Sequence, residues 1–243
     1  MNEIITVRGL TKSFADGEKK VTALNGVDLT VYEGDIFGVI GLSGAGKSTF
    51  VRCLNRLEEP DEGSIIINGQ DVRELSEKEL NIARRNIGMI FQQFNLLSQA
   101  SILDNVCFPM EIAHWKKADA KKRALELIKL VGLAGRENAY PAQLSGGMKQ
   151  RCAIARAFAI DPPILLMDEP FGALDAVTRA KLQDMVIELW HKQEPKKTVF
   201  FVTHDVDEAI LLSTKIFVLG QSPSNVIFTC DIPADNRPTR ETQ

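Results

Sequence analysis

The sequence has no apolar run long enough to cross a membrane as a helix, and no strong excess of either charge. A helical span needs about 20 consecutive apolar residues, so an integral membrane protein is not expected. The formal net charge of −3 leaves no basic footprint for nucleic acid, and no nucleic-acid partner is expected. Residues 1–4 contain neither a basic segment nor a long apolar one, so we expect no secretory signal.

Cysteine is scarce and widely spaced, at Cys53, Cys107, Cys152 and Cys230. No Cys-x-x-Cys pair occurs, and both zinc sites and structural disulfides usually need closer spacing. We therefore expect small, buried, reduced thiols and a protein that works inside the cell. The 243 residues, 44% hydrophobic and 25% charged, suffice for one large domain with its own core.

A glycine-rich segment stands between an apolar run at 36–40 and the start of a helix at 50–54. Its spacing is that of the phosphate-binding loop, G-x-x-x-x-G-K-[ST]. Small residues let consecutive backbone N–H groups surround a polyphosphate, and the positive end of the next helix faces the same charge. The pattern predicts a nucleoside triphosphate site formed by Gly41, Leu42, Ser43, Gly44, Ala45, Gly46, Lys47, Ser48 and Thr49.

Two side chains of this loop have specific expected tasks. Lys47 would reach the β- and γ-phosphates, and the Ser48 hydroxyl would complete a Mg²⁺ shell made mostly of water and phosphate oxygen. A glycine-rich turn without a ligand is the alternative. It is disfavoured because the motif stands in the required strand–loop–helix context.

Hydrophobic periodicity divides the chain into three kinds of structure. Residues 4–9 and 21–31 indicate an antiparallel β segment, with a turn near Asn25-Gly26. Apolar runs at 36–40, 87–91, 164–167 and 198–202 are typical of buried strands. Between about 95 and 160 the period is helical, which predicts an α-helical subdomain inserted into an α/β frame. We expect one domain over residues 1–232 and a mobile polar tail over 233–243.

The four buried strands end on polar residues, and these would meet at one sheet edge if the strands are parallel neighbours. Asp168 would hold Mg²⁺ directly or through water, and Glu169 would polarise a water near the γ-phosphate. His204 can donate to the γ-phosphate, and Gln92 can ligate the metal or orient water. A lone histidine or glutamine is more often structural, but their strand-end positions favour function.

Two further features carry open alternatives. Phe14 precedes a charged turn, where an exposed aromatic can stack on a base or simply cover the end of a sheet. Ser145-Gly146-Gly147 begins a second helix with small residues and a hydroxyl, which suits an anion. That helix belongs to the predicted insertion, so one chain cannot easily bring both anion sites to one γ-phosphate. A head-to-tail pair of chains can.

Together these residues resemble the ATP-binding subunits of ABC transporters over nearly the whole chain. GLSGAGKS is similar to the Walker A motif, LSGGM to the signature loop, and ILLMDEP to Walker B with its catalytic glutamate. Phe91-Gln92 resembles the Q-loop, with Gln93 as the alternative glutamine, and Thr203-His204 the H-loop. Residues 173–175 resemble the D-loop, which adds Asp175 to the expected nucleotide site. Phe14 falls where the family's adenine-stacking aromatic lies, while Met148 stands where glutamine is commonest.

The resemblance implies a P-loop NTPase core of mainly parallel sheet, an antiparallel β subdomain and the helical insertion. It implies an ATPase whose two copies clasp two ATP molecules with Mg²⁺ and drive separate integral membrane permease subunits from the cytoplasmic face of the membrane. A solute-binding protein would take part indirectly. The surface that receives a permease helix would lie near Gln92, with core packing as the alternative for its candidate residues Phe94, Leu96, Leu97 and Phe108.

The resemblance is less specific about the direction of transport and about the transported substrate. Residues 36–97 resemble methionine-importer subunits, whereas 168–175 and 203–209 are similar to nitrate/sulfonate/taurine importers, and we favour the latter. The chain stops near residue 243, without the regulatory extension of many methionine-type subunits. An export or lipoprotein-release ATPase is an alternative. A non-transport ABC ATPase is a further one, disfavoured by the absence of a basic excess, a coiled coil or a zinc insert.

Overall fold

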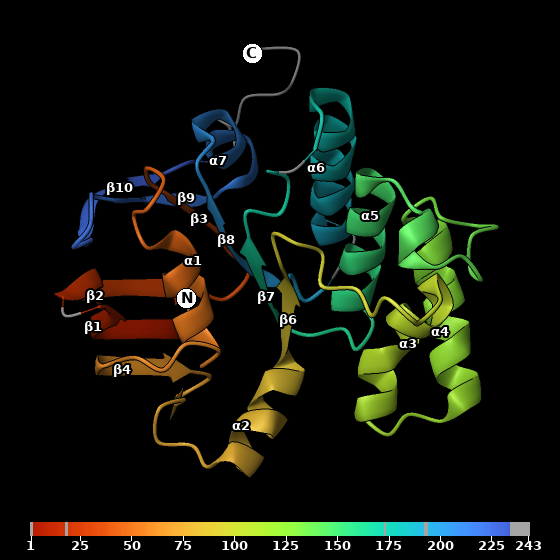
Figure 1. Ribbon diagram of the computed structural model, residues 1–243, viewed down its shortest axis with the longest axis horizontal. Coiled ribbons are helices and arrows are strands. Elements are labelled where there is room, and N and C mark those ends of the chain that lie inside the picture. The colour runs from red at the N-terminus through yellow and green to blue at the C-terminus, as the bar shows by residue number, and fades with distance from the viewer. Residues whose placement is uncertain (1, 18, 173, 192–193, 234–243) are drawn as a thin grey trace.

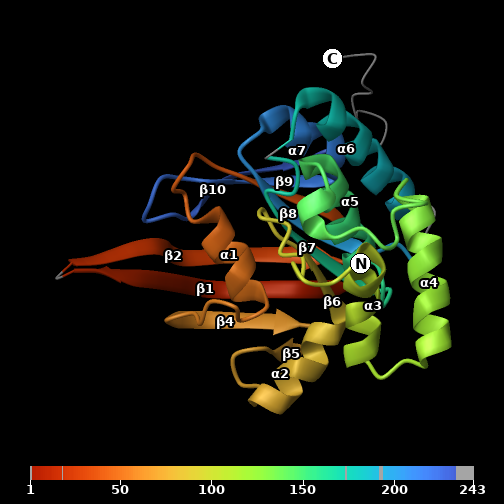
Figure 2. The same ribbon diagram turned by 45° about the vertical axis from the view of Figure 1, so that its right-hand side comes forward.

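Two β-sheets lie on either side of helix α1 (Lys47–Leu54), as Figures 1 and 2 show. The computed structural model describes residues 2–17, 19–172, 174–191 and 194–233. One sheet is mainly parallel and the other antiparallel. The α/β fold class expected from the sequence is thus confirmed.

The central sheet has the strand order β10-β9-β3-β8-β7-β6. Its strands are β3 (Ile36–Ile40), β6 (Ile87–Ile90), β7 (Ile164–Asp168), β8 (Thr198–Thr203), β9 (Lys215–Leu219) and β10 (Val226–Asp231). Only β10 runs antiparallel to its neighbour. The four strands expected to deliver polar groups, β3, β8, β7 and β6, are consecutive neighbours, so their carboxyl ends share one edge.

Both faces of the central sheet are covered, which explains its continuous apolar strands. Side chains alternate between the faces, so that in β7 Leu166 belongs to one core while Leu165 and Met167 belong to the other. The first core includes α1 and the antiparallel sheet. The second includes α5 (Gly146–Ala157), α6 (Ala176–His191) and α7 (Val206–Leu212). Helices α1 and α5 therefore pack on opposite faces.

The antiparallel sheet has the order β2-β1-β4-β5. Its strands are β1 (Glu3–Asp16), β2 (Lys19–Tyr32), β4 (Glu62–Ile67) and β5 (Gln70–Asp71). The turn expected near Asn25-Gly26 is wrong, because β2 continues through it. Leu10 pairs with Val27 and Lys12 with Leu24, so β2 carries one extra residue there. Gly26, with φ 66°, lets the strand absorb this residue as a bulge.

Hydroxyl caps begin two helices that flank β6. Ser76 and Glu79 form a capping box at α2 (Glu77–Ala83), which continues as the 3₁₀ turn η1 (Arg84–Asn86). Ser101 and Asp104 do the same for α3 (Ile102–Ile112). Helix α3 packs against α4 (Lys117–Leu130) and α5 at one side of the molecule (Figure 1), and the 3₁₀ turn η2 (Pro141–Gln143) precedes α5.

The expected boundaries, near 95 and 160 for the subdomain and 232 for the domain, stay predictions. Residues 234–243 of the expected tail lie outside the described part of the chain.

Three of the four thiols are buried as expected, and the fourth is not. Cys53, Cys107 and Cys152 are buried, whereas Cys230 is exposed on the edge strand β10. Burial raises the pKa of Cys53 to about 12 and that of Cys152 to about 11, so both thiols stay protonated near neutral pH. Among the described residues, no helix combines the length and apolarity that a bilayer crossing requires.

Candidate functional site

The phosphate loop joins β3 to α1, and its lysine turns back onto the loop. Lys47 is only 4% exposed, and its Nζ donates to the carbonyl oxygens of Gly41 at 2.9 Å and Leu42 at 3.0 Å. The same Nζ lies 3.6 Å from Glu169 Oε1. Gly46 has φ 75°, and a Cβ there would come within 2.9 Å of a main-chain oxygen of β2. The buried ammonium is therefore compensated by three oxygens in a loop that requires glycine.

The other residues of the phosphate loop differ in how far they are exposed to solvent. Leu42, Ser43 and Gly44 are exposed, and Gly44 has a left-handed backbone with φ 80°. Ala45 is buried, and Thr49 is half-buried on α1. The exposed side of the loop is thus open to a ligand from solvent.

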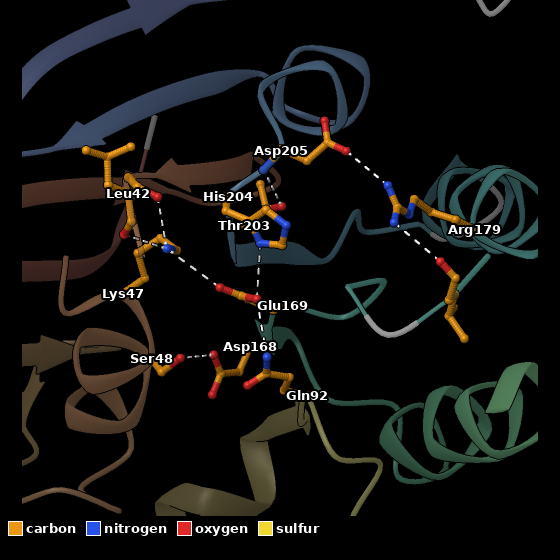
Figure 3. A network of polar contacts seen from close by, with 12 residues as sticks. Leu42, Lys47, Ser48, Gln92, Asp168, Glu169, Arg179, Thr203, His204 and Asp205 are labelled. Atoms are coloured by element: carbon orange, nitrogen blue, oxygen red, sulfur yellow. Dashed lines mark hydrogen bonds and ion pairs between the residues drawn. The ribbon is translucent and has the colours of Figure 1, made fainter. Parts of the chain in front are cut away.

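Glu169 is the centre of the polar cluster at the shared sheet edge (Figure 3). Its Oε2 accepts from Gln92 Nε2 at 3.3 Å and lies 3.2 Å from His204 Nδ1, while Oε1 faces Lys47. Glu169 itself has a left-handed backbone with φ 43°, which is uncommon for glutamate. Of the two glutamines after β6, Gln92 is the one that donates to this cluster. The edge thus gathers groups from β3, β6, β7 and β8 around one carboxylate.

A second carboxylate, Asp168, lies beside the loop with oxygen atoms suited to a hard cation. Its side chain is fully buried, Oδ1 accepts from Ser48 Oγ at 2.6 Å, and Oδ2 has no hydrogen-bond partner among the described residues. Arg52 Nη2 lies 3.5 Å from Oδ2. A carboxylate and a hydroxyl are ligands that Mg²⁺ accepts, and Oδ2, which faces Arg52 without a hydrogen bond, keeps its acceptor capacity. The residues therefore fit Mg²⁺ held mainly by phosphate and water.

Phe14 lies apart from this cluster, near the end of β1 in the antiparallel sheet. It is 38% exposed, and Lys12 Nζ sits 5.1 Å from the centre of its ring. Ser13, Gly17, Lys19, Lys20 and Asp61 are among the residues that line a shallow hollow with it. An exposed ring in a hollow can stack on a base, and the role of Phe14 stays a prediction.

The Ser145 helix tip lies on the other side of the central sheet from α1. Ser145 caps α5 and accepts from the Met148 N–H at 3.3 Å. A Cβ at Gly147 would come within 2.6 Å of Thr178 Cγ2, so α5 and α6 approach closely there. Asp175 caps α6 by accepting from the Thr178 N–H at 3.0 Å, and these hydrogen bonds hold the pKa of Asp175 below its usual value. The structure thus brings the start of α5, which Ser145 caps, close to the start of α6, which Asp175 caps.

Two arginines of the site were missed from the sequence. Arg52 follows Ser48 by one helical turn on α1, a spacing that could have indicated a shared target. Arg179 Nη1 pairs with Asp205 Oδ2 at 3.2 Å and Nη2 donates to the Leu174 carbonyl at 3.3 Å, which ties the start of α6 to the residue after His204 (Figure 3). No sequence signal pointed to Arg179, because its partner is 26 positions away.

A groove of about 770 Å³ opens next to Gln92, between α2, α3 and α5. Leu97, Phe108 and Ile112 form apolar parts of its wall, and Arg84, Arg85, His114 and Arg156 supply basic ones. Of the four surface candidates, Leu97 and Phe108 line the groove and each is 39% exposed. Leu96 packs partly buried against the core, which is the alternative that the sequence left open for it. Phe94 lies beside Gly146, with its Cζ 4.0 Å from where a Cβ would stand.

Known proteins resemble this arrangement in sequence and in structure. Residues 24–172 match the family described as ABC transporter. The methionine import ATP-binding protein of Vibrio vulnificus is 46% identical over 217 residues, which cover 89% of this chain and 62% of that protein. One from Enterococcus faecalis is 50% identical over 216 residues, with coverage of 89% and 62%. The chain thus spans 62% of the length of these relatives.

A solved structure extends the comparison to the fold. It is the dimeric post-hydrolysis state of an ATP-binding cassette bound to ADP and Pi, with a TM-score of 0.86 and 36% identity. The match covers 95% of this chain and all of that one.

Proposed function

Since this chain belongs to the ABC transporter family, we propose that it binds and hydrolyses ATP to drive solute import through separate membrane subunits. The observation that carries the proposal is the Glu169 cluster. Lys47, Gln92 and His204 come from three different strand ends and converge on one carboxylate at the carboxyl edge of the sheet. Convergence of this kind characterises a reaction site rather than a folding contact.

In the nucleotide-bound state Lys47 would exchange its carbonyl partners for the β- and γ-phosphates, and the loop N–H groups of residues 41–49 would surround them. Glu169, freed from Lys47, would accept a proton from the attacking water, while His204 and Gln92 fix its carboxylate. Mg²⁺, held by Ser48 and Asp168, with Gln92 as a further ligand, would neutralise phosphate charge. Phe14 would stack on the adenine.

The second half of each site would come from another copy of the chain. Lys47 and Ser145 stand at the tips of helices on opposite faces of the sheet, so Ser145-Gly146-Gly147 and Asp175 would serve the partner's nucleotide. The dimeric state of the solved cassette supports this arrangement. We therefore propose a homodimer that closes on two ATP molecules.

The proposed cargo is methionine or a chemically similar solute. The methionine import proteins support this over the nitrate/sulfonate/taurine alternative, which the sequence alone had favoured. The permease subunits would sit on the groove beside Gln92, whose apolar wall and basic rim suit an amphipathic segment with an acidic end. The chain would then lie at the cytoplasmic face of the membrane, with a solute-binding protein acting on the permease from the other side.

The decisive experiment measures ATP hydrolysis and nucleotide binding by the full chain and two variants. Glu169→Gln should lower kcat by at least about 10²-fold while ATP still binds, because only water activation is lost. Lys47→Ala should weaken binding itself, because it removes the charge that meets the phosphates. Normal turnover in Glu169→Gln, or unchanged ATP affinity in Lys47→Ala, would contradict the assignment.

A further inference from the structure

One arginine of α5 holds the turn that follows β6. Arg156 Nη1 donates to the carbonyl oxygen of Asn95 at 2.6 Å, and Nη2 donates to that of Phe94 at 2.9 Å. A planar guanidinium can satisfy two neighbouring acceptors at once, which an ammonium does less well. Two consecutive main-chain carbonyls of the turn are therefore fixed by a single side chain from another element.

The turn needs an external partner because its backbone is unusual. Phe94 has φ 56° and Asn95 has φ 47°, so two consecutive residues other than glycine adopt the left-handed region. Such residues persist only where their surroundings fix them. Burial also lowers the pKa of the Arg156 guanidinium, because removing the charge from water is unfavourable. The hydrogen bonds to the two carbonyl oxygens offset this desolvation penalty.

The same segment connects the Glu169 cluster to the groove. Gln92, at its start, donates to Glu169, while Asn95, Leu97 and Arg156 line the groove. At its far end Asn105 accepts from the Leu97 N–H at 2.8 Å and donates to the Leu97 carbonyl at 3.1 Å. Residues 92–97 are thus tethered by Gln92 at the site, by Arg156 on α5 and by Asn105 on α3.

Helix α5 meets this segment near both of its ends. Arg156 lies in its last turn, and Gly146, beside the Phe94 ring, lies in its first. The turn therefore contacts α5 near both of its ends, and Ser145 caps the first of these ends.

We propose that Arg156 is a positioning residue that makes the 92–95 turn and α5 move as one unit. The clamp fixes the position from which Gln92 reaches Glu169. Its consequence for catalysis rests on the proposed function. The hydrogen bonds of Arg156 to the turn do not depend on the proposed function, so the clamp and its effect on catalysis can be tested separately.

The first test is hydrogen exchange on the full chain without nucleotide. Arg156→Met should raise the exchange of amides 92–97 about tenfold or more, while β7 and β8 keep their wild-type rates. Arg123→Met is the matched control, because Arg123 donates to the Phe158 carbonyl at 3.5 Å and does not touch the turn. It should leave amides 92–97 within about twofold of wild type. Unchanged exchange in Arg156→Met, or an equal rise in the control, overturns the proposal.

Arg156→Lys keeps the charge without the planar fork and serves if the methionine variant does not fold. It should raise exchange in the same segment at least about threefold, and wild-type exchange there would overturn the proposal. The kinetic readout is a split between kcat and KM. Arg156→Met should lower kcat about tenfold with KM for ATP within about twofold, because it misplaces Gln92 without touching the Lys47 loop. A rise in KM with unchanged kcat contradicts the proposed role.

Discussion

At the residue scale, the site depends on single side chains that each satisfy several partners. Glu169 faces Lys47, Gln92 and His204 from a left-handed backbone, a conformation that costs about 1–3 kcal/mol and persists where function requires it. Lys47 is buried among oxygens that a triphosphate can replace. Under the proposed function, a bound triphosphate would take the place of these contacts.

The buried carboxyl group of Glu208 should make the stability of the fold depend on pH. It is 4% exposed, Gln183 Nε2 donates to its Oε1 at 2.7 Å, and burial raises its pKa above the ordinary 4.5. A carboxyl whose folded pKa is raised stabilises the fold below its unfolded pKa and loses that contribution as pH rises through the folded pKa. Glu208→Gln remains neutral throughout. The free energy of unfolding of wild type minus that of Glu208→Gln should therefore fall as pH rises.

Denaturant titrations of both proteins from about pH 4 to pH 8 measure this difference. Other titrating groups cancel between the two proteins, so the difference isolates residue 208. A constant difference across the range would refute the raised pKa.

At the element scale, a close approach between β6 and α5 sets where these two elements lie. Gly88 in β6 is the clearest case, since a Cβ there would lie 2.7 Å from the Ala157 carbonyl oxygen and 2.7 Å from Leu165 Cδ2. The first neighbour is the last residue of α5 and the second belongs to β7. Glycine thus lets α5 lie directly on β6, which brings Arg156 within reach of the turn that β6 enters.

Gly88→Ala should lower the free energy of unfolding by about 1–3 kcal/mol through overpacking, because main-chain atoms cannot yield as a flexible side chain does. Gly172→Ala is a suitable control for stability, since its nearest neighbour would be 3.5 Å away, an ordinary contact. Denaturant midpoints of the two variants compare them directly. Equal stability of Gly88→Ala and wild type would show that the contact relaxes without strain.

At the scale of the whole molecule, the proposed dimer depends on the positions of the Lys47 loop and the Ser145 tip. Helix α1 packs on one face of the central sheet and α5 on the other, so the sheet lies between the two helices. In the proposed function, two chains in head-to-tail order would bring the loop of one chain to the tip of the other. The proposed dimer follows from the sheet that separates the two helices.

Glu169→Gln with MgATP should elute at twice the mass of one chain, because the nucleotide stays bound and holds the interface closed. Size-exclusion chromatography with light scattering measures this. Adding Ser145→Arg to the same variant should return it to a monomer, since the larger side chain occupies the anion position. A monomeric Glu169→Gln protein with nucleotide demonstrably bound argues against the composite site.

The sequence by itself determined the local chemistry. The strand–loop–helix order around the glycine-rich segment and the apolar strands follow from residues close together in the chain, where spacing alone sets geometry. Strand-end polar residues also predicted a shared edge, and the strand order confirms it. The expected turn at Asn25-Gly26 failed because asparagine–glycine suits a turn and a bulge equally, and only pairing with β1 selects the bulge.

Only the tertiary structure decided contacts between distant segments. It selected Gln92 over Gln93 as the donor to Glu169, exposed Cys230 on an edge strand, and joined Arg179 to Asp205 and Arg156 to the 94–95 turn. Hydrophobic periodicity indicates which side of its own helix or strand a side chain lies on, but not which other element packs against that side. That neighbour depends on strand order and helix packing, which arise from burial summed over the whole chain.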